Sequence, residues 1–112
     1  AKPDFEGLLR GGTYIVFDAK ESADKTSLPL VNLREHQVEY LKMVDRLGGI
    51  AFFLVHFYKL YPDKAYKIPI KFILPYWEKW KYEKGRASIP IKDLTEDMLV
   101  EILNYLGLED GT

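Results

Sequence analysis

The stretch that decides the fold is TYIVFDAK, residues 13–20, which is rich in β-branched and aromatic side chains. Such a composition predicts a β-strand. Because side chains alternate along a strand, Asp18 and Lys20 share one face, while Phe17 and Ala19 share the other. The strand therefore carries an acid and an amine close together on one face of the expected sheet.

A second carboxylate lies just upstream of this strand. Asp4 opens a strand-like segment over residues 4–9, which leads into a turn at Gly11-Gly12. If the two strands pair across this turn, Asp4 approaches Asp18 at one edge of a sheet. Carboxylates supply the hard oxygen ligands of Mg²⁺, and an ammonium beside them can assist at the reacting atom. The pattern favours metal-assisted phosphodiester cleavage; the alternative is that both acids only end a turn and a strand.

Composition restricts the classes of protein that remain. With 112 residues, 47% hydrophobic and 29% charged, we expect one globular domain. Cysteine is absent, which excludes disulfides and thiolate zinc sites. The longest apolar run, residues 50–55, is too short to span a membrane, and no signal peptide is visible. The chain begins with Ala1 rather than methionine, so we expect a further segment upstream.

The net charge of −1 hides a segregation of charge along the chain. Residues 64–92 contain eight basic side chains against two acids, a local balance of +6. After Lys92 there are six acids and no lysine or arginine. This asymmetry predicts a surface that binds phosphate on one side, although a basic helix can equally be a solvated face.

The remaining chain predicts a mixed α/β fold. We expect a polar loop over residues 21–31, and a helix from an N-cap at Asn32, with Glu35 in a capping box, to Leu47 before Gly48-Gly49. The apolar run 50–57 predicts a strand covered on both faces. A strand over 65–70, a helix over 72–83 and a helix from Thr95 to Gly107 follow. This order predicts a mixed sheet flanked by helices.

One polar residue interrupts the apolar stripe expected on the first helix. Gln37 lies at helical spacing among apolar residues, namely Leu33, Tyr40, Leu41, Val44 and Leu47. A buried glutamine needs a specific hydrogen-bond partner. We place Gln37 at the catalytic edge, because its helix follows the strand that carries Lys20; the alternative is a structural hydrogen bond to a loop carbonyl.

Several motifs occur in order and at spacings that resemble one family. They are DFEG at 4–7, FDAKES at 17–22, KTSLPL at 25–30, Asn32, HQ at 36–37 and GRASIP at 85–90. Together they resemble RecU-type Holliday junction resolvases, over Pro3 to about Leu94. That family belongs to the restriction-endonuclease-like superfamily, so the resemblance implies a mixed central sheet flanked by helices and a Mg²⁺-dependent nuclease site.

The resemblance also implies a role for each matching residue. Asp4 and Asp18 would bind the metal together with the carbonyl oxygen of Ala19. Lys20 would position or activate the attacking water, and Gln37 would lie at the edge of the catalytic site. The implied DNA contacts are Ser22, Lys25, Thr26, His36 and Arg86.

The implied protein is a single nuclease domain over residues 1–112 that uses Mg²⁺, or Mn²⁺ in its place, to cut four-way DNA junctions as a homodimer. We expect it in the cytoplasm of a bacterial, archaeal or phage-infected cell, without membrane contact. Two departures from the family stand out: Asp18 replaces the common glutamate, and the family's N-terminal acid and junction-inserting stalk are not among these residues. The alternatives are a nuclease for other branched or duplex DNA, and a non-catalytic junction-binding protein.

Overall fold

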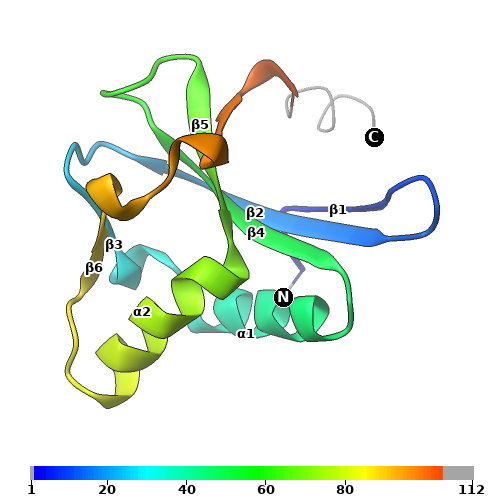
Figure 1. Cartoon of the computed structure of the whole chain (residues 1–112), viewed down its shortest axis with the longest axis horizontal. Coiled ribbons are helices and arrows are strands. Elements are labelled where there is room, and N and C mark those ends of the chain that lie inside the picture. Colours follow the sequence, from blue (N-terminus) through cyan, green and yellow to red (C-terminus); the bar gives the residue numbers. More distant parts are fainter. Residues whose placement is uncertain (1, 105–112) are drawn as a thin grey trace.

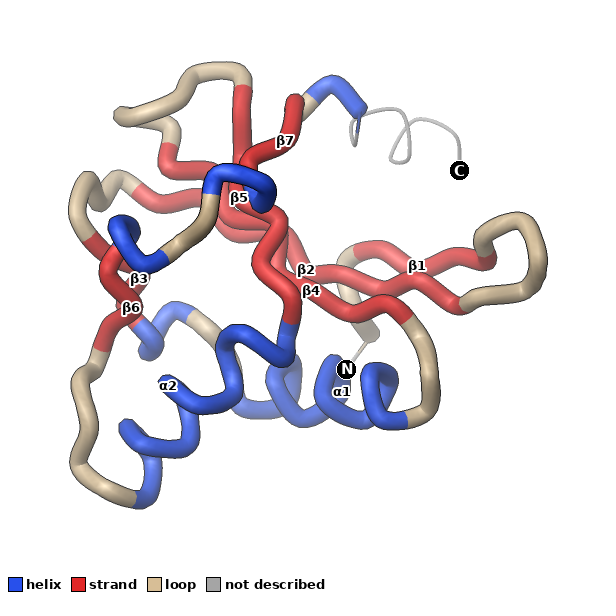
Figure 2. The backbone as a smooth tube through the Cα atoms, in the orientation of Figure 1, coloured by secondary structure: helices blue, strands red, loops and turns tan. Residues whose placement is uncertain are grey.

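Five strands form the central sheet of the computed structural model, which describes residues 2–104 (Figures 1 and 2). Their order in the sheet is β1-β2-β4-β5-β7, and only β2 and β4 run parallel. The strands are β1 (Phe5–Leu8), β2 (Tyr14–Ser22), β4 (Ile50–Phe57), β5 (Lys64–Pro69) and β7 (Leu99–Glu101). The predicted mixed sheet is therefore confirmed, and it is compatible with a restriction-endonuclease-like arrangement.

The first two strands pair as the sequence predicts. β1 and β2 are antiparallel, with Phe5 opposite Phe17 and Leu8 opposite Tyr14. Gly11 and Gly12 in the connecting turn have φ angles of +98° and +94°, a left-handed backbone that glycine adopts without steric cost. Continued by one residue, the same register sets Asp4 beside Asp18.

The two helices pack on one face of the sheet (Figures 1 and 2). α1 (Glu35–Arg46) connects the parallel strands β2 and β4, and α2 (Ile70–Tyr82) follows β5 directly. Parallel neighbouring strands need such a crossover connection, because a tight turn can join only antiparallel strands. Within the described residues, no helix combines the length and the apolar composition needed to cross a membrane.

The predicted start of the first helix is wrong. Asn32 ends a short 3₁₀ helix, η1 (Leu30–Asn32), and the N-cap of α1 is Arg34. The capping-box partner is also displaced: Gln37, not Glu35, accepts the hydrogen bond from the N-cap backbone. The 3₁₀ turn uses the same local signals as a helix start, which explains the displacement.

Strand β4 is buried on both faces, as its apolar run predicts. On one face, Phe53 and Val55 contact the core shared with α1 and α2. On the other face, Phe52 stacks on Phe17 at a ring-centroid distance of 4.8 Å, and Phe17 stacks on Phe5 at 4.6 Å. Offset stacking of this kind adds to the burial of apolar area. The two layers hold β2, which carries the candidate residues, between fixed neighbours.

Ion pairs join the two helices and neutralise part of the basic segment. The Nζ atom of Lys81 lies 3.1 Å from Oε1 of Glu35. Lys42 and Glu78 lie 3.9 Å apart, and Lys71 and Asp45 lie 3.8 Å apart. Two of the eight basic residues counted over 64–92 are thus paired with acids of α1. The charge counted along residues 64–92 is therefore larger than the positive charge that remains unpaired and available to a ligand.

A second, two-stranded sheet replaces part of the loop expected over 21–31, while residues 21–22 belong to β2 and residues 30–31 to η1. β3 (Ser27–Pro29) pairs antiparallel with β6 (Ser88–Pro90). Backbone hydrogen bonds extend the pairing at both ends, from the Leu30 N–H to the Ala87 carbonyl at 2.8 Å and from the Ile91 N–H to the Thr26 carbonyl at 2.9 Å. Two loops that are distant in sequence are therefore held together.

The helix predicted from Thr95 to Gly107 is wrong over its first half. Thr95 precedes a 3₁₀ helix, η3 (Glu96–Met98), and residues 99–101 form β7, which pairs with β5. The available edge of β5 offers this segment a ladder of backbone hydrogen bonds, and such tertiary pairing overrides a helical apolar spacing. Residues 105–107 of the prediction lie outside the described residues.

We predict that Gly49→Ala destabilises the fold by about 1–3 kcal/mol, the usual cost of overpacking. A Cβ at this position would lie 2.6 Å from Cγ1 of Val44 and 3.0 Å from the Tyr14 carbonyl oxygen, so the junction of α1 and β4 would have to shift. Urea unfolding measures the change. Gly7→Ala is the matched control, because its nearest contact would be Ile15 Cγ2 at 4.0 Å; an equal loss in both variants would contradict the packing argument.

Candidate active site

Reciprocal hydrogen bonds between side chains and backbone fix the two predicted acids. The Asp4 N–H donates to Oδ1 of Asp18 at 2.8 Å, and the Ala19 N–H donates to Oδ2 of Asp4 at 3.0 Å. Asp18 is only 1% exposed, whereas Asp4 is open to solvent. Each bond uses one oxygen of a carboxylate and leaves the other oxygen for a further ligand.

The backbone carbonyl of Ala19 belongs to the same site. In a strand, the N–H and C=O of one residue point toward the same neighbour, so this carbonyl faces the side on which Asp4 lies. The register that sets Phe5 opposite Phe17 brings Pro3 opposite Ala19. Proline has no N–H, so residue 3 cannot donate a ladder hydrogen bond to that carbonyl. Two carboxylates and one carbonyl therefore face the same point of the sheet edge.

Burial raises the pKa of the Asp18 carboxyl above its ordinary value, and the negative charge of Asp4 adds to this effect. The hydrogen bond from the Asp4 backbone and the positive charges of Lys20 and His36 act in the opposite direction. Ionised Asp18 is thus costly for the protein on its own. A cation bound beside it would lower that cost.

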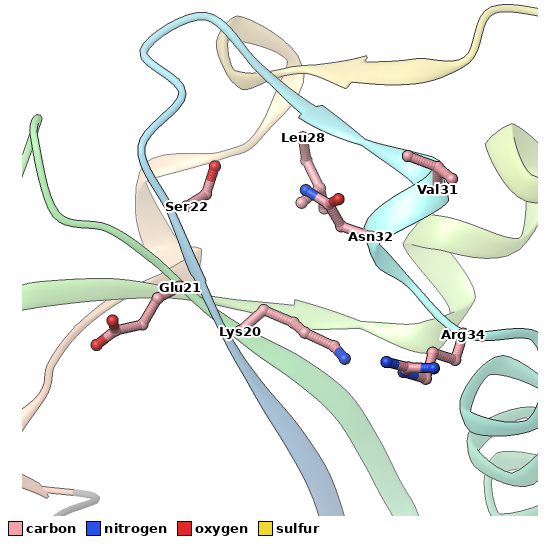
Figure 3. A pocket seen from close by; sticks show the side chains of 7 residues that line it. All are labelled: Lys20, Glu21, Ser22, Leu28, Val31, Asn32 and Arg34. Atoms are coloured by element: carbon pink, nitrogen blue, oxygen red, sulfur yellow. The ribbon is translucent and has the colours of Figure 1, made fainter.

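Lys20 lies two residues beyond Asp18 on the same face of β2. It is partly buried and lines a pocket of about 470 Å³ at the end of this strand (Figure 3). The other lining residues are Glu21, Ser22, Leu28, Val31, Asn32 and Arg34. The structure therefore brings together the three predicted residues Asp4, Asp18 and Lys20, with an open pocket next to them.

The start of α1 faces the same region and carries two further predicted residues. Gln37 is partly buried, and its Oε1 accepts a hydrogen bond from the Arg34 N–H at 3.3 Å, so it caps the helix. His36 is exposed in the first turn. The predicted apolar stripe is wrong at Leu47, which is 80% exposed; Val38 takes its place in the core.

The predicted DNA contacts divide into two groups. Lys25, Thr26 and Arg86 line one pocket of about 600 Å³, although the two segments are about 60 residues apart in sequence. Ser22 lines the other pocket, but its hydroxyl donates to Asp24 Oδ2 at 2.9 Å and accepts from the Asp24 N–H at 3.1 Å, which closes a turn.

Two cations near these pockets were not assigned a role from the sequence. Lys92 lies with Lys25, Thr26 and Arg86, and its only signal was its place in the basic segment. Arg34 lies with Lys20. It had no signal of its own, because a single arginine before a helix is ordinary.

The mixed five-stranded sheet with two helices is compatible with the fold class of the restriction-endonuclease-like nucleases. The family model described as Recombination protein U matches residues 1–108 of this chain. The chain therefore belongs to the RecU family, as the sequence motifs predict.

Individual relatives support the same family. The chain is 40% identical to the Holliday junction resolvase RecU of Pediococcus pentosaceus over 93 residues, which are 83% of this chain and 44% of the relative. It is 37% identical to the protein of that name from Bacillus pumilus over 102 residues, 91% of this chain and 47% of the relative. It is 39% identical to the protein of that name from Oenococcus oeni over 109 residues, which are 92% of this chain and 53% of the relative. The chain spans about half the length of the curated relatives that it matches.

We predict that Asp18→Asn raises the thermal midpoint at neutral pH in the absence of divalent metal. The asparagine oxygen can still accept from the Asp4 N–H, but no buried charge remains. The pKa of Asp18 is raised in the folded state, so ionised Asp18 lowers the stability of the wild type above that pKa. This loss of stability disappears as the pH falls and folded Asp18 takes up a proton.

The difference in midpoint between the two proteins should therefore shrink from pH 8 toward pH 4. Thermal melts across this range measure it, and Glu39→Gln is the control, because Glu39 is an exposed acid of α1 that forms no ion pair among the described residues. A midpoint of Asp18→Asn below that of the wild type at pH 8 would refute the burial argument.

Proposed function

We propose that this chain carries the catalytic site of a Mg²⁺-dependent endonuclease that resolves four-way DNA junctions by paired phosphodiester cleavage. The observation that carries the proposal is a pair of hydrogen bonds beside Lys20: the Asp4 N–H donates to the Asp18 carboxylate, and the Ala19 N–H donates to the Asp4 carboxylate. Membership of the RecU family supports the choice of substrate.

The donor atoms of the site fit a hard divalent cation. Among residues 2–104, no three histidine, cysteine, aspartate or glutamate side chains gather around one point. The fit thus rests on two carboxylates, Asp4 and Asp18, together with the Ala19 carbonyl. All are oxygen ligands, which suit Mg²⁺ and also Mn²⁺. Water molecules and phosphate oxygens commonly complete the coordination of Mg²⁺ in phosphate chemistry.

The proposed division of labour follows from the charges. Hydroxide and a phosphodiester repel one another, so a catalyst must offset negative charge and align a water. The bound metal would supply Lewis acidity and lower the pKa of a coordinated water. Asp18 and Asp4 would hold that ion, and the Lys20 ammonium would stabilise charge that develops on the phosphorus oxygens.

The DNA backbone is proposed to pass from this site across β3. The residues of β3 contribute to both pockets, Leu28 to the one with Lys20 and Ser27 to the one with Arg86. Lys25, Arg86 and Lys92 would contact phosphates beyond the cleavage point, and Thr26 adds a hydroxyl donor. His36 would approach the strand from the start of α1.

A homodimer is part of the proposal, since two-fold symmetry gives each protomer one of the two nicks. The relatives come from bacteria, and we place the reaction in the cytoplasm of a bacterial or phage-infected cell. The chain spans about half the length of the relatives on which this part of the proposal rests.

We predict Mg²⁺-dependent, paired, symmetric nicks in a labelled four-way junction, and no cleavage of a duplex of the same sequence. Asp18→Asn should lose at least ~100-fold of the cleavage rate, because removal of one ligand charge weakens metal binding and charge stabilisation. EDTA should abolish the activity, and Mn²⁺ should restore it. Denaturing gels of each labelled strand measure the nicks.

Three other outcomes separate the alternatives. Cleavage of both substrates would retain the active site and replace the junction with a broader DNA substrate. Tight junction binding without cleavage in the presence of Mg²⁺ would indicate a non-catalytic binding protein. Wild-type rates in Asp18→Asn would remove this residue from the site.

We also predict that Arg86→Ala and Lys25→Ala each weaken junction binding and lower the slope of log K against log salt by about 1, as expected when one phosphate contact is lost. Fluorescence anisotropy over a salt series measures both quantities. Lys59→Ala, an exposed lysine in the turn after β4, is the control. An unchanged slope would exclude these residues from the phosphate contacts.

A further inference from the structure

The pocket beside Lys20 contains a second cation. Arg34 lines it from the segment that precedes α1, while Lys20 lines it from β2. Figure 3 shows the Lys20 ammonium and the Arg34 guanidinium pointing toward one another across the pocket. Two like charges therefore face the same space of about 470 Å³.

The pocket lining does not balance these charges. Its one acid is Glu21, which Figure 3 shows on the other side of β2, pointing away from Lys20 and Arg34. Oε1 of Glu21 instead lies 3.8 Å from Nδ1 of His56. The other lining residues are neutral: Ser22, Leu28, Val31 and Asn32. The pocket thus concentrates positive charge without a counter-charge in its lining.

Arg34 differs in this respect from three lysines of the helices. Lys42, Lys71 and Lys81 each form an ion pair with an acid. Within residues 2–104, the Arg34 side chain forms no such pair. Its backbone N–H donates to Gln37 Oε1, and its carbonyl accepts from the N–H groups of Gln37 and Val38. These bonds fix the point from which the side chain leaves the backbone. The repulsion between Arg34 and Lys20 would be relieved by an anion placed between them.

We infer that Arg34 is a phosphate-binding residue that positions the DNA strand for cleavage; the inference rests on the proposed function. Lys20 lies next to Asp18 and so faces the scissile phosphate. Arg34, farther along the pocket, binds the adjacent phosphate of the same strand. Its planar guanidinium can donate two parallel hydrogen bonds to the oxygens of one phosphate, which fixes orientation as well as position. Gln37 supports this role through the Arg34 backbone.

The binding test uses Asp18→Asn protein, so that DNA is not cut during the measurement. In this background, Arg34→Ala should weaken binding of a four-way junction about tenfold and lower the salt slope by about 1, because one charge-assisted phosphate contact is lost. Arg34→Lys should keep the slope, because the charge remains, but should bind more weakly than arginine, because an ammonium cannot make the paired hydrogen bonds.

Arg46→Ala is the matched control. Arg46 is an exposed arginine at the opposite end of α1, and its loss removes the same charge from the protein. We expect Arg46→Ala to keep the affinity and the salt slope of the Asp18→Asn parent. All variants should have thermal midpoints close to that of this parent. Unchanged affinity and slope in Arg34→Ala, or an equal loss in Arg46→Ala, would overturn the inference.

A second measurement tests positioning with Asp18 intact. At saturating junction and Mg²⁺, Arg34→Ala should lower the single-turnover cleavage rate about tenfold, since a misplaced phosphate reacts more slowly even when it is bound. Arg34→Lys should recover part of the rate, and a full wild-type rate in Arg34→Ala would refute positioning. If the wild type cuts no DNA, the proposed function fails, while the binding comparison still decides whether Arg34 contacts phosphate.

Discussion

The pairing of β1 with β2 is the constraint on which the site depends. In its register, Phe5 lies opposite Phe17, so Asp4 falls beside Asp18 and Pro3 beside Ala19. A shift by one residue would turn every β1 side chain to the other face of the sheet. It would break the stack of Phe5 on Phe17 together with the hydrogen bonds from the Asp4 N–H to Asp18 and from the Ala19 N–H to Asp4. One packing interaction thus holds the two carboxylates in place.

The same arrangement places a cost on folding. Asp18 is buried on the helix side of β2, and its pKa is raised because its charge is poorly solvated. The backbone N–H of Asp4 and the nearby charges of Lys20 and His36 compensate only in part. The apolar layers on both faces of β4 provide the stability that lets such a residue remain. A buried carboxylate that is suited to binding a cation lowers the stability of the fold as long as no cation is bound.

The sequence predicted those parts of the fold that are determined by residues close together in the chain. The alternation in residues 13–20 and the Gly11-Gly12 turn predicted the hairpin, and with it the meeting of Asp4, Asp18 and Lys20. The pairing of β3 with β6 was missed, because three-residue strands 60 residues apart leave no periodic signal. The last helix was wrong because apolar spacing cannot show that the edge of β5 is available. The role of Arg34 could not be predicted from the sequence either, because it depends on the three-dimensional arrangement that leaves its side chain without an acidic partner among the described residues.

Charge pairing also explains how a chain with net charge −1 can present the proposed DNA-binding surface. The acids of α1 neutralise Lys71 and Lys81 on the nearby helix, and Lys67 lies 4.8 Å over the ring of Phe52. These lysines stabilise contacts within the fold. Lys25, Arg86 and Lys92 line a separate pocket beside the β3–β6 sheet, in segments held by backbone hydrogen bonds. The capacity to bind phosphate therefore depends on which cations the helices leave unpaired, rather than on the sum of charges along the basic segment.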